Sequence, residues 1–247
     1  MENNVFIYWT GKEYSLIKVL RKIIYLHSEG GKHYSVIMIT PDTVHQYIRN
    51  VPDGFFKLKP AHQADIVRVC VLRERGGIWL DSDTVVMDDL SLLFDTIRKK
   101  DGFLLTDRGG LINGIIGSKP YTPLMNMWYR TIMDTLCVRK GVIQWTEIGS
   151  TILERLYKND TSLFSSYKIF DGPATMHPVH WSDSVREFIT SDYDNYKTIE
   201  RAEQPLVILF NSVYKHLDSY SEDQIVGGRF PLSYFIRKSV ITSSVFV

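Results

Sequence analysis

The stretch AHQADIVRVCVLRERGGIWLDSDTVVMDDL, residues 61–90, decides the fold class of this chain. Residues 61–75 have the apolar spacing of an amphipathic helix, which the pair Gly76-Gly77 ends. The apolar residues 78–80 then predict a short buried strand, and this strand runs into the acidic sequence Asp81-Ser82-Asp83. A helix that leads directly into a buried strand is the repeating unit of α/β folds.

The residues nearer the N-terminus predict a second unit of the same kind. Residues 5–9 form an apolar run that stops at Thr10-Gly11, residues 14–28 have helical spacing, and residues 35–39 are again apolar. Strand, helix and strand in this order indicate a parallel βαβ unit. We therefore expect an α/β fold with a mixed, mainly parallel central sheet.

The remainder of the chain continues this alternation. We expect further strands at 103–105, 111–116 and 206–210, and helices at 123–137 and 145–157. The polar and aromatic stretch 177–204 predicts loops and short helices. The sequence contains neither internal repeats nor a long linker, so we expect a single domain over residues 1–247.

The composition excludes several classes of protein. The 247 residues carry 29 Lys and Arg against 28 Asp and Glu, and 44% of them are hydrophobic, as in ordinary globular domains. The net charge of +1 argues against a general nucleic-acid-binding protein, which needs a basic surface. The sequence has neither the pattern of a signal peptide nor an apolar run long enough for a membrane span. We therefore expect either a cytoplasmic protein or a catalytic domain of a longer protein.

The acidic sequence after residues 78–80 is the first candidate for a functional site. Ligands of open α/β sheets bind at the carboxyl ends of strands, where Asp81 and Asp83 are expected. Two ionised carboxylates close together repel each other, and a divalent cation removes this cost. Oxygen ligands favour Mg²⁺ or Mn²⁺. Taken alone, however, two aspartates at this spacing also fit a solvated acidic turn.

Two charged residues on the preceding helix make the pattern more specific. Asp65 and Arg68 are three residues apart and share a helix face, which also suits a surface ion pair. Together, A-x-x-x-D-x-x-R followed by G-G-I-W-L-D-x-D resembles the conserved core of glycosyltransferase family 32. The same spacing of Asp, Arg and D-x-D occurs in the large clostridial glucosylating toxins.

This resemblance implies a fold and an activity. The fold would be GT-A, with a nucleotide-sugar and metal-binding part at 1–120 and an acceptor-side part with a C-terminal closing segment at 121–247. The activity would be metal-dependent transfer of a hexose from a nucleotide sugar, with UDP-glucose as an example of the favoured UDP-sugars. The acceptor would be a glycan or another hydroxyl compound, and the anomeric configuration would be retained. A bacterial or viral type of enzyme fits the expected location.

The resemblance also implies roles for the residues around the acidic sequence. Asp81 and Asp83 would hold Mn²⁺ or Mg²⁺ against the donor diphosphate, with Asp83 the more direct ligand, and Ser82 between them would touch the donor. Asp65 would accept hydrogen bonds from hydroxyls of the donor sugar. Arg68 would bind sugar or phosphate oxygens. Trp79 either contacts the donor or is a core aromatic residue.

Residues outside this segment complete the implied site. Tyr8, Trp9 and Thr10 resemble the part of the family that meets the nucleotide base, although Tyr8 and Trp9 also suit the core. Asn113 resembles an asparagine that approaches the donor sugar. Glu147, where relatives carry T-G-P, either faces the anomeric carbon or an acceptor hydroxyl, or interacts with a helix N-terminus. A third metal ligand is expected near the C-terminus, with the candidates Asn211 and His216.

Two other classes of protein remain open. The sequence DSDTVV also fits the haloacid-dehalogenase phosphatases, in which Asp81 would be the nucleophile and Asp83 the general acid and base. A non-catalytic nucleotide-sugar-binding module on the same fold is the second alternative. Release of nucleotide from a donor separates these alternatives from a transferase.

Overall fold

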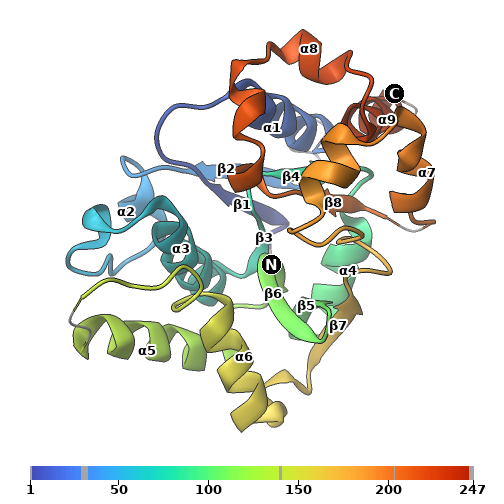
Figure 1. Ribbon diagram of the computed structural model, residues 1–247. Helices are drawn as coiled ribbons and strands as arrows, with labels where there is room; N and C mark the ends of the chain where they lie inside the picture. Colours follow the sequence, from blue (N-terminus) through green and yellow to red (C-terminus); the bar gives the residue numbers. More distant parts are fainter. Residues whose placement is uncertain (1, 29–32, 139–140, 203, 245–247) are drawn as a thin grey trace. The chain divides into compact units, whose positions relative to one another are not determined.

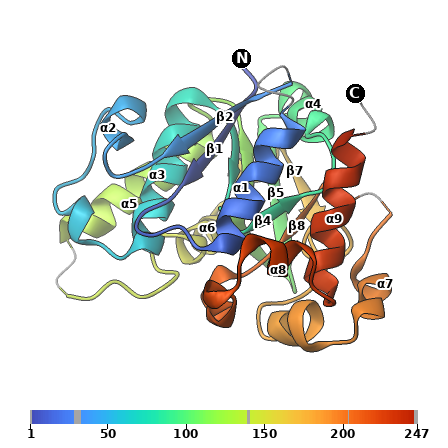
Figure 2. The same ribbon diagram turned by 90° about the horizontal axis from the view of Figure 1, so that it is seen from above.

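The computed structural model describes residues 2–28, 33–138, 141–202 and 204–244. Helices and strands alternate along these residues, so the predicted α/β class is confirmed (Figures 1 and 2). The chain divides into two compact units that interleave along the sequence. The first unit is formed by residues within 1–10, 37–81 and 92–170. The second is formed by residues within 11–36, 82–91 and 171–247.

A six-stranded mixed sheet forms the centre of the first unit. Its strand order is β2-β1-β3-β6-β5-β7. β1 and β3 are parallel, with Phe6 opposite Trp79, whereas β6 is antiparallel to both β3 and β5. The carboxyl ends of β1 and β3 therefore lie at the same edge of the sheet. The strands are β1 (Asn4–Tyr8), β2 (Ser35–Ile39), β3 (Gly77–Leu80), β5 (Gly102–Asp107), β6 (Gly110–Ser118) and β7 (Tyr167–Asp171).

Three helices of this unit, α3, α5 and α6, lie side by side (Figure 1). α3 begins at Pro60, whose fixed φ suits the first helical turn, and it ends before Gly76, which has a φ of +67°. α3 also contacts β1 and β3, so that the helix and the strand of the deciding stretch pack together. The helices are α2 (Val44–Tyr47), η1 (Phe55–Lys57), α3 (Pro60–Arg75), α4 (Ser91–Lys99), α5 (Pro123–Val138), α6 (Ser150–Asn159) and η2 (Thr161–Phe164).

The second unit is mainly helical and contains one pair of strands. β4 (Thr84–Val86) and β8 (Leu206–Ile208) are antiparallel. α1 (Ser15–His27) packs against β4, α8 and α9, and Figure 2 shows these elements together. The other helices are η3 (Arg186–Thr190), η4 (Tyr193–Asn195), α7 (Tyr196–Ile199), η5 (Asn211–Val213), η6 (Lys215–Ser219), α8 (Glu222–Val226) and α9 (Pro231–Ser244). Within the described parts of the chain, every helix is too short or too polar to cross a membrane.

The structure corrects several boundaries. The helix expected from residue 145 begins at Ser150, because Gly149 has non-helical angles of φ −96° and ψ −114° and turns occupy the preceding residues. The last strand ends at Ile208 rather than 210. The sequence patterns did not reveal β4, α4, β7 or α9. β4 has only three residues, too few to establish a period.

The two compact units do not divide at residue 120. β7 belongs to the same sheet as β1, and β4 pairs with β8, so residues from both halves of the chain build each unit. Strand pairing between distant segments produces this interleaving. The single functional domain that we expect over the whole chain stays a prediction.

Candidate active site

Arg68 lies between two carboxylates in the first unit. Its Nη1 donates to Asp65 Oδ1 at 2.5 Å, and its Nη2 donates to Asp81 Oδ1 at 2.6 Å. Asp65 and Arg68 come from one face of α3, and Asp81 follows β3 directly. The guanidinium therefore joins the helix to the end of the strand through two charge-assisted hydrogen bonds.

Trp79 contacts both members of the Arg68–Asp81 ion pair. Its ring is 1% exposed, and its Nε1 donates to Asp81 Oδ1 at 2.7 Å. The Arg68 guanidinium carbon lies 5.0 Å from the centroid of the same ring, within the range of a cation–π contact. The Trp79 ring is thus buried in the core, and its indole N–H orients Asp81, whereas a contact of Trp79 with the donor stays a prediction.

Burial determines the electrostatics of this cluster. The side chains of Arg68 and Asp65 are 4% and 9% exposed, whereas that of Asp81 is 35% exposed. Burial raises the pKa of Asp65 to about 6, although Arg68 acts in the opposite direction. Burial would lower the pKa of Arg68, but the charges of Asp81 and Asp65 outweigh it and raise this pKa. The guanidinium is thus permanently charged, and its buried Nε has no hydrogen-bond partner in the described residues.

Backbone and amide groups of β6 approach the two carboxylates. Asn113 Nδ2 donates to Asp65 Oδ1 at 2.9 Å, and the Asp81 N–H donates to the Gly114 carbonyl at 2.8 Å. A Cβ at Gly114 would stand 3.1 Å from Asp81 Oδ2. Among the described residues, the side-chain hydrogen bonds to Asp81 come from Arg68 and Trp79 and both end on Oδ1, so Oδ2 is the oxygen that these residues leave for a ligand.

Gly149 closes the same cluster from the N-terminal end of α6. A Cβ at this position would stand 2.6 Å from Asp65 Oδ1 and 2.7 Å from Asn113 Nδ2. Only glycine therefore allows this close approach. The sequence patterns did not indicate Gly149 or Gly114. A glycine inside the helix expected at 145–157 was the available signal, but nothing in the sequence showed which side chains it would meet.

Asp83 belongs to the second unit, where it is half-buried. Its Oδ2 accepts a hydrogen bond from the backbone N–H of Asn211 at 2.6 Å, so the structure brings these two predicted residues together. His216 lies in η6 and is exposed. Within the described residues, no three His, Cys, Asp or Glu side chains form a ready metal site. The third metal ligand stays a prediction.

The remaining predicted residues lie at strand and helix ends. Tyr8 is 5% exposed, and its hydroxyl donates to Gln63 Oε1 at 2.5 Å. Trp9 and Thr10, just after β1, are half-buried. Ser82 is a half-buried turn residue between the two aspartates. Of these residues, Trp9 and Thr10 keep the accessibility that contact with a base would need.

Glu147 lies in the turn before α6 rather than in the helix itself. Its Oε2 accepts a hydrogen bond from the Gln144 N–H at 2.8 Å, and the residue is half-buried. This turn leads to Gly149, which contacts Asp65 and Asn113. Glu147 therefore lies two residues before Gly149 in the chain, and its role near the donor stays a prediction.

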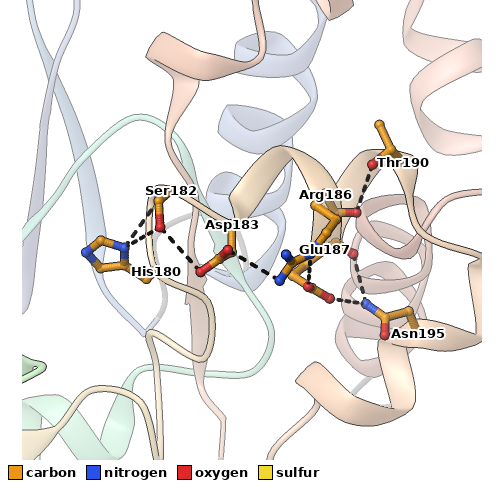
Figure 3. Close-up of polar contacts among 7 residues, drawn as sticks. All are labelled: His180, Ser182, Asp183, Arg186, Glu187, Thr190 and Asn195. Atoms are coloured by element: carbon orange, nitrogen blue, oxygen red, sulfur yellow. Dashed lines mark hydrogen bonds and ion pairs between the residues drawn. The ribbon is translucent and has the colours of Figure 1, made fainter.

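The second unit contains another polar cluster, which lies around η3 (Figure 3). His180 bonds to Ser182, and Arg186 pairs with both Asp183 and Glu187. Glu187 in turn accepts from Asn195 Nδ2 at 2.6 Å. These bonds connect near neighbours in the sequence, and they fix the shape of a surface segment.

Comparisons with known structures identify the fold that carries the Asp65–Arg68–Asp81 cluster. The glycosyltransferase GlyE of Streptococcus pneumoniae TIGR4 is similar with a TM-score of 0.56 and 14% identity, over 99% of this chain and 62% of that chain. A glycosyltransferase involved in the glycosylation of the major capsid of PBCV-1 has a TM-score of 0.52 and 9% identity, over 89% and 98% of the two chains. The fold is that of the GT-A glycosyltransferases.

The family follows from the sequence match. The chain belongs to the capsular polysaccharide synthesis protein family, which matches residues 1–128. This confirms the resemblance drawn from the spacing of Asp65, Arg68 and the two later aspartates. The uncharacterized protein At4g19900 of Arabidopsis thaliana is 32% identical over 103 residues, which are 41% of this chain. The chain spans 15% of the length of that relative and 62% of GlyE.

Proposed function

We propose that this protein transfers a hexose from a nucleotide sugar to a glycan or another hydroxyl acceptor. The observation that carries the proposal is the buried Arg68 between Asp65 and Asp81 at the carboxyl edge of the sheet. The fold and the family support this class of enzyme, whereas neither of them is that of a haloacid-dehalogenase phosphatase. The spacing shared with the glucosylating toxins favours UDP-hexoses such as UDP-glucose as donors.

The carboxylates fit a divalent cation. In the described parts of the chain, Arg68 and Trp79 hold Oδ1 of Asp81 and leave Oδ2 for a ligand, and carboxylate oxygens suit Mn²⁺ or Mg²⁺. We propose that Asp81 and Asp83 hold this ion, on the basis of their spacing in the sequence. When bound, the cation would neutralise charge on the donor diphosphate.

The side chains of the chain itself position and stabilise the reacting groups. Arg68 supplies a fixed positive charge to the sugar or phosphate oxygens, and its buried position keeps that charge strong. Asp65 and Asn113 bind the hydroxyls of the donor sugar. The bond from the anomeric carbon to the diphosphate oxygen breaks, the acceptor oxygen bonds to this carbon, and the acceptor proton leaves with the diphosphate. We propose that the configuration is retained, with Glu147 near the anomeric carbon or the acceptor hydroxyl.

The direct test is nucleotide release from a panel of UDP- and GDP-sugars, with Mn²⁺ and with EDTA. We expect metal-dependent release from one UDP-hexose even without an acceptor, because water can replace the acceptor slowly. Cleavage of a phosphomonoester without any donor release would favour the phosphatase. Tight donor binding without turnover would instead favour the non-catalytic binding module.

Substitution of Asp65 tests the division between sugar and nucleotide recognition. We expect Asp65→Asn to weaken binding of UDP-glucose about 10-fold, because a charged hydrogen-bond acceptor for sugar hydroxyls is lost. Binding of UDP should change much less. Calorimetric titration with both ligands measures the difference, and equal losses for the two would contradict the role given to Asp65.

A further inference from the structure

An exposed tryptophan lies in the turn that leads from residue 141 to α6. The side chain of Trp145 is 61% exposed, although Ile143 and Ile148 on either side are 8% and 0% exposed. Burial of a large apolar ring is ordinarily favourable, so its exposure is the unusual feature of this segment.

Two hydrogen bonds hold the backbone turn that carries Trp145. The Gln144 N–H donates to Glu147 Oε2 at 2.8 Å, and the Glu147 N–H donates to the Gln144 carbonyl at 3.1 Å. These two bonds close the turn on both sides of Trp145. Because the backbone that carries Trp145 is held in this way, the turn itself loses little conformational freedom when a ligand stacks on the ring.

α3 fixes the position of the same turn. His62 is 2% exposed, and its Nε2 donates to the Gln144 carbonyl at 3.0 Å. His62 precedes Asp65 by three residues, so both side chains lie on the same face of α3. The helix face that carries the predicted sugar-binding carboxylate therefore also anchors the turn beside Trp145.

The other end of the turn reaches the candidate site itself. Gly149, four residues after Trp145, lies against Asp65 and Asn113. The turn that carries Trp145 is thus connected to this site on both sides, through Gln144 to His62 and through Gly149 to Asp65. Trp145 is 61% exposed, whereas the side chain of Asp65 is 9% exposed, so a ligand reaches the tryptophan directly from solvent.

We propose that Trp145 binds the acceptor by stacking on the apolar face of a saccharide ring. This inference rests on the proposed function and names the acceptor class as a saccharide. The negative face of an aromatic ring attracts the C–H groups of a sugar, and the neighbouring Glu147 provides a polar group for hydroxyls. The acceptor arrives from solvent, so an exposed ring suits binding of the acceptor better than binding of a donor sugar at the buried carboxylate of Asp65.

The first experiment measures whether a saccharide covers Trp145. The protein, with UDP and Mn²⁺, is oxidised by N-bromosuccinimide in the presence of methyl glycosides of glucose, galactose, mannose and N-acetylglucosamine. Peptide mass spectrometry then compares oxidation at Trp145 with that at Trp181, which is 57% exposed and lies in the second unit, where its ring packs against His180. At about ten times its Kd, a bound glycoside should slow oxidation of Trp145 about tenfold relative to Trp181.

Variants connect this binding with transfer. The protecting glycoside, as acceptor, should stimulate nucleotide release by the wild type. Trp145→Ala should lower this stimulation about tenfold, equivalent to about 1.4 kcal/mol, and Trp145→Phe should restore most of it. Trp181→Ala is the matched control and should keep the stimulation. If no glycoside protects Trp145, or if Trp181→Ala causes the same loss, the inference is wrong. If metal-dependent nucleotide release persists although no glycoside protects Trp145, the proposed transferase function stands and only this inference fails. If no donor releases its nucleotide, the proposed function itself is wrong.

Discussion

Replacement of Arg68 by methionine is expected to lower the free energy of unfolding by about 3–5 kcal/mol, the cost of breaking a buried ion pair. The substitution removes the cation from two carboxylates, and among the described residues the side-chain hydrogen bond that Asp65 would keep comes from the amide of Asn113. An unpaired buried carboxylate is costly because the protein interior solvates it poorly. Urea denaturation of the wild type and of Arg68→Met measures the difference in the free energy of unfolding. Because the chain has two compact units, the slopes of the two transitions are compared to show that both proteins unfold in the same way.

α4 offers a matched control for this substitution. Arg98 pairs with Asp95 at the same spacing as Arg68 with Asp65, but these side chains are 53% and 50% exposed. Arg98→Met should therefore cost less than about 1 kcal/mol. Equal losses for Arg68→Met and Arg98→Met would show that the buried pair contributes no special stability.

Replacement of Asp83 by asparagine is expected to lower metal-dependent donor turnover about 100-fold or more, because it removes a charged ligand of the proposed cation. The substitution preserves the size of the side chain, and its oxygen can still accept from the Asn211 N–H. The protein should therefore remain folded. Nucleotide release at several Mn²⁺ concentrations, together with the thermal transition, separates loss of metal binding from loss of structure.

Asp88 provides the control for this second substitution. It is an exposed acidic residue in the same segment of the second unit as Asp83. Asp88→Asn removes the same charge, so turnover should stay within about twofold of the wild type. Full turnover by a folded Asp83→Asn variant would refute the metal role of Asp83.

The fold class and the central pattern follow from residues close together in the sequence. The spacing of apolar residues over 61–80 predicts α3 and β3, and the two glycines between them mark the boundary. The three-residue spacing places Asp65 and Arg68 on one face of α3, as the structure confirms by their hydrogen bond. Such patterns work because the geometry of a helix or strand relates sequence spacing directly to direction in space.

Only the tertiary structure decided how distant segments complete the cluster. The pairing of β3 with β6 brings Gly114 to Asp81, and the packing of α6 brings Gly149 to Asp65. The sequence suggested Asn113 by resemblance alone, and it suggested neither glycine. It also left open whether Trp79 contacts a ligand, whereas the structure shows that its ring is buried and that its N–H orients Asp81.

The same distinction applies to Trp145 and to the start of α6. The apolar pattern extends through the preceding turn, so periodicity alone placed the beginning of the helix at 145 instead of 150. The backbone bonds of the turn and the hydrogen bond from His62 determine where the helix begins and leave Trp145 exposed. Local spacing determines which face of an element a residue occupies, whereas contacts between elements depend on how the whole chain buries its apolar surface.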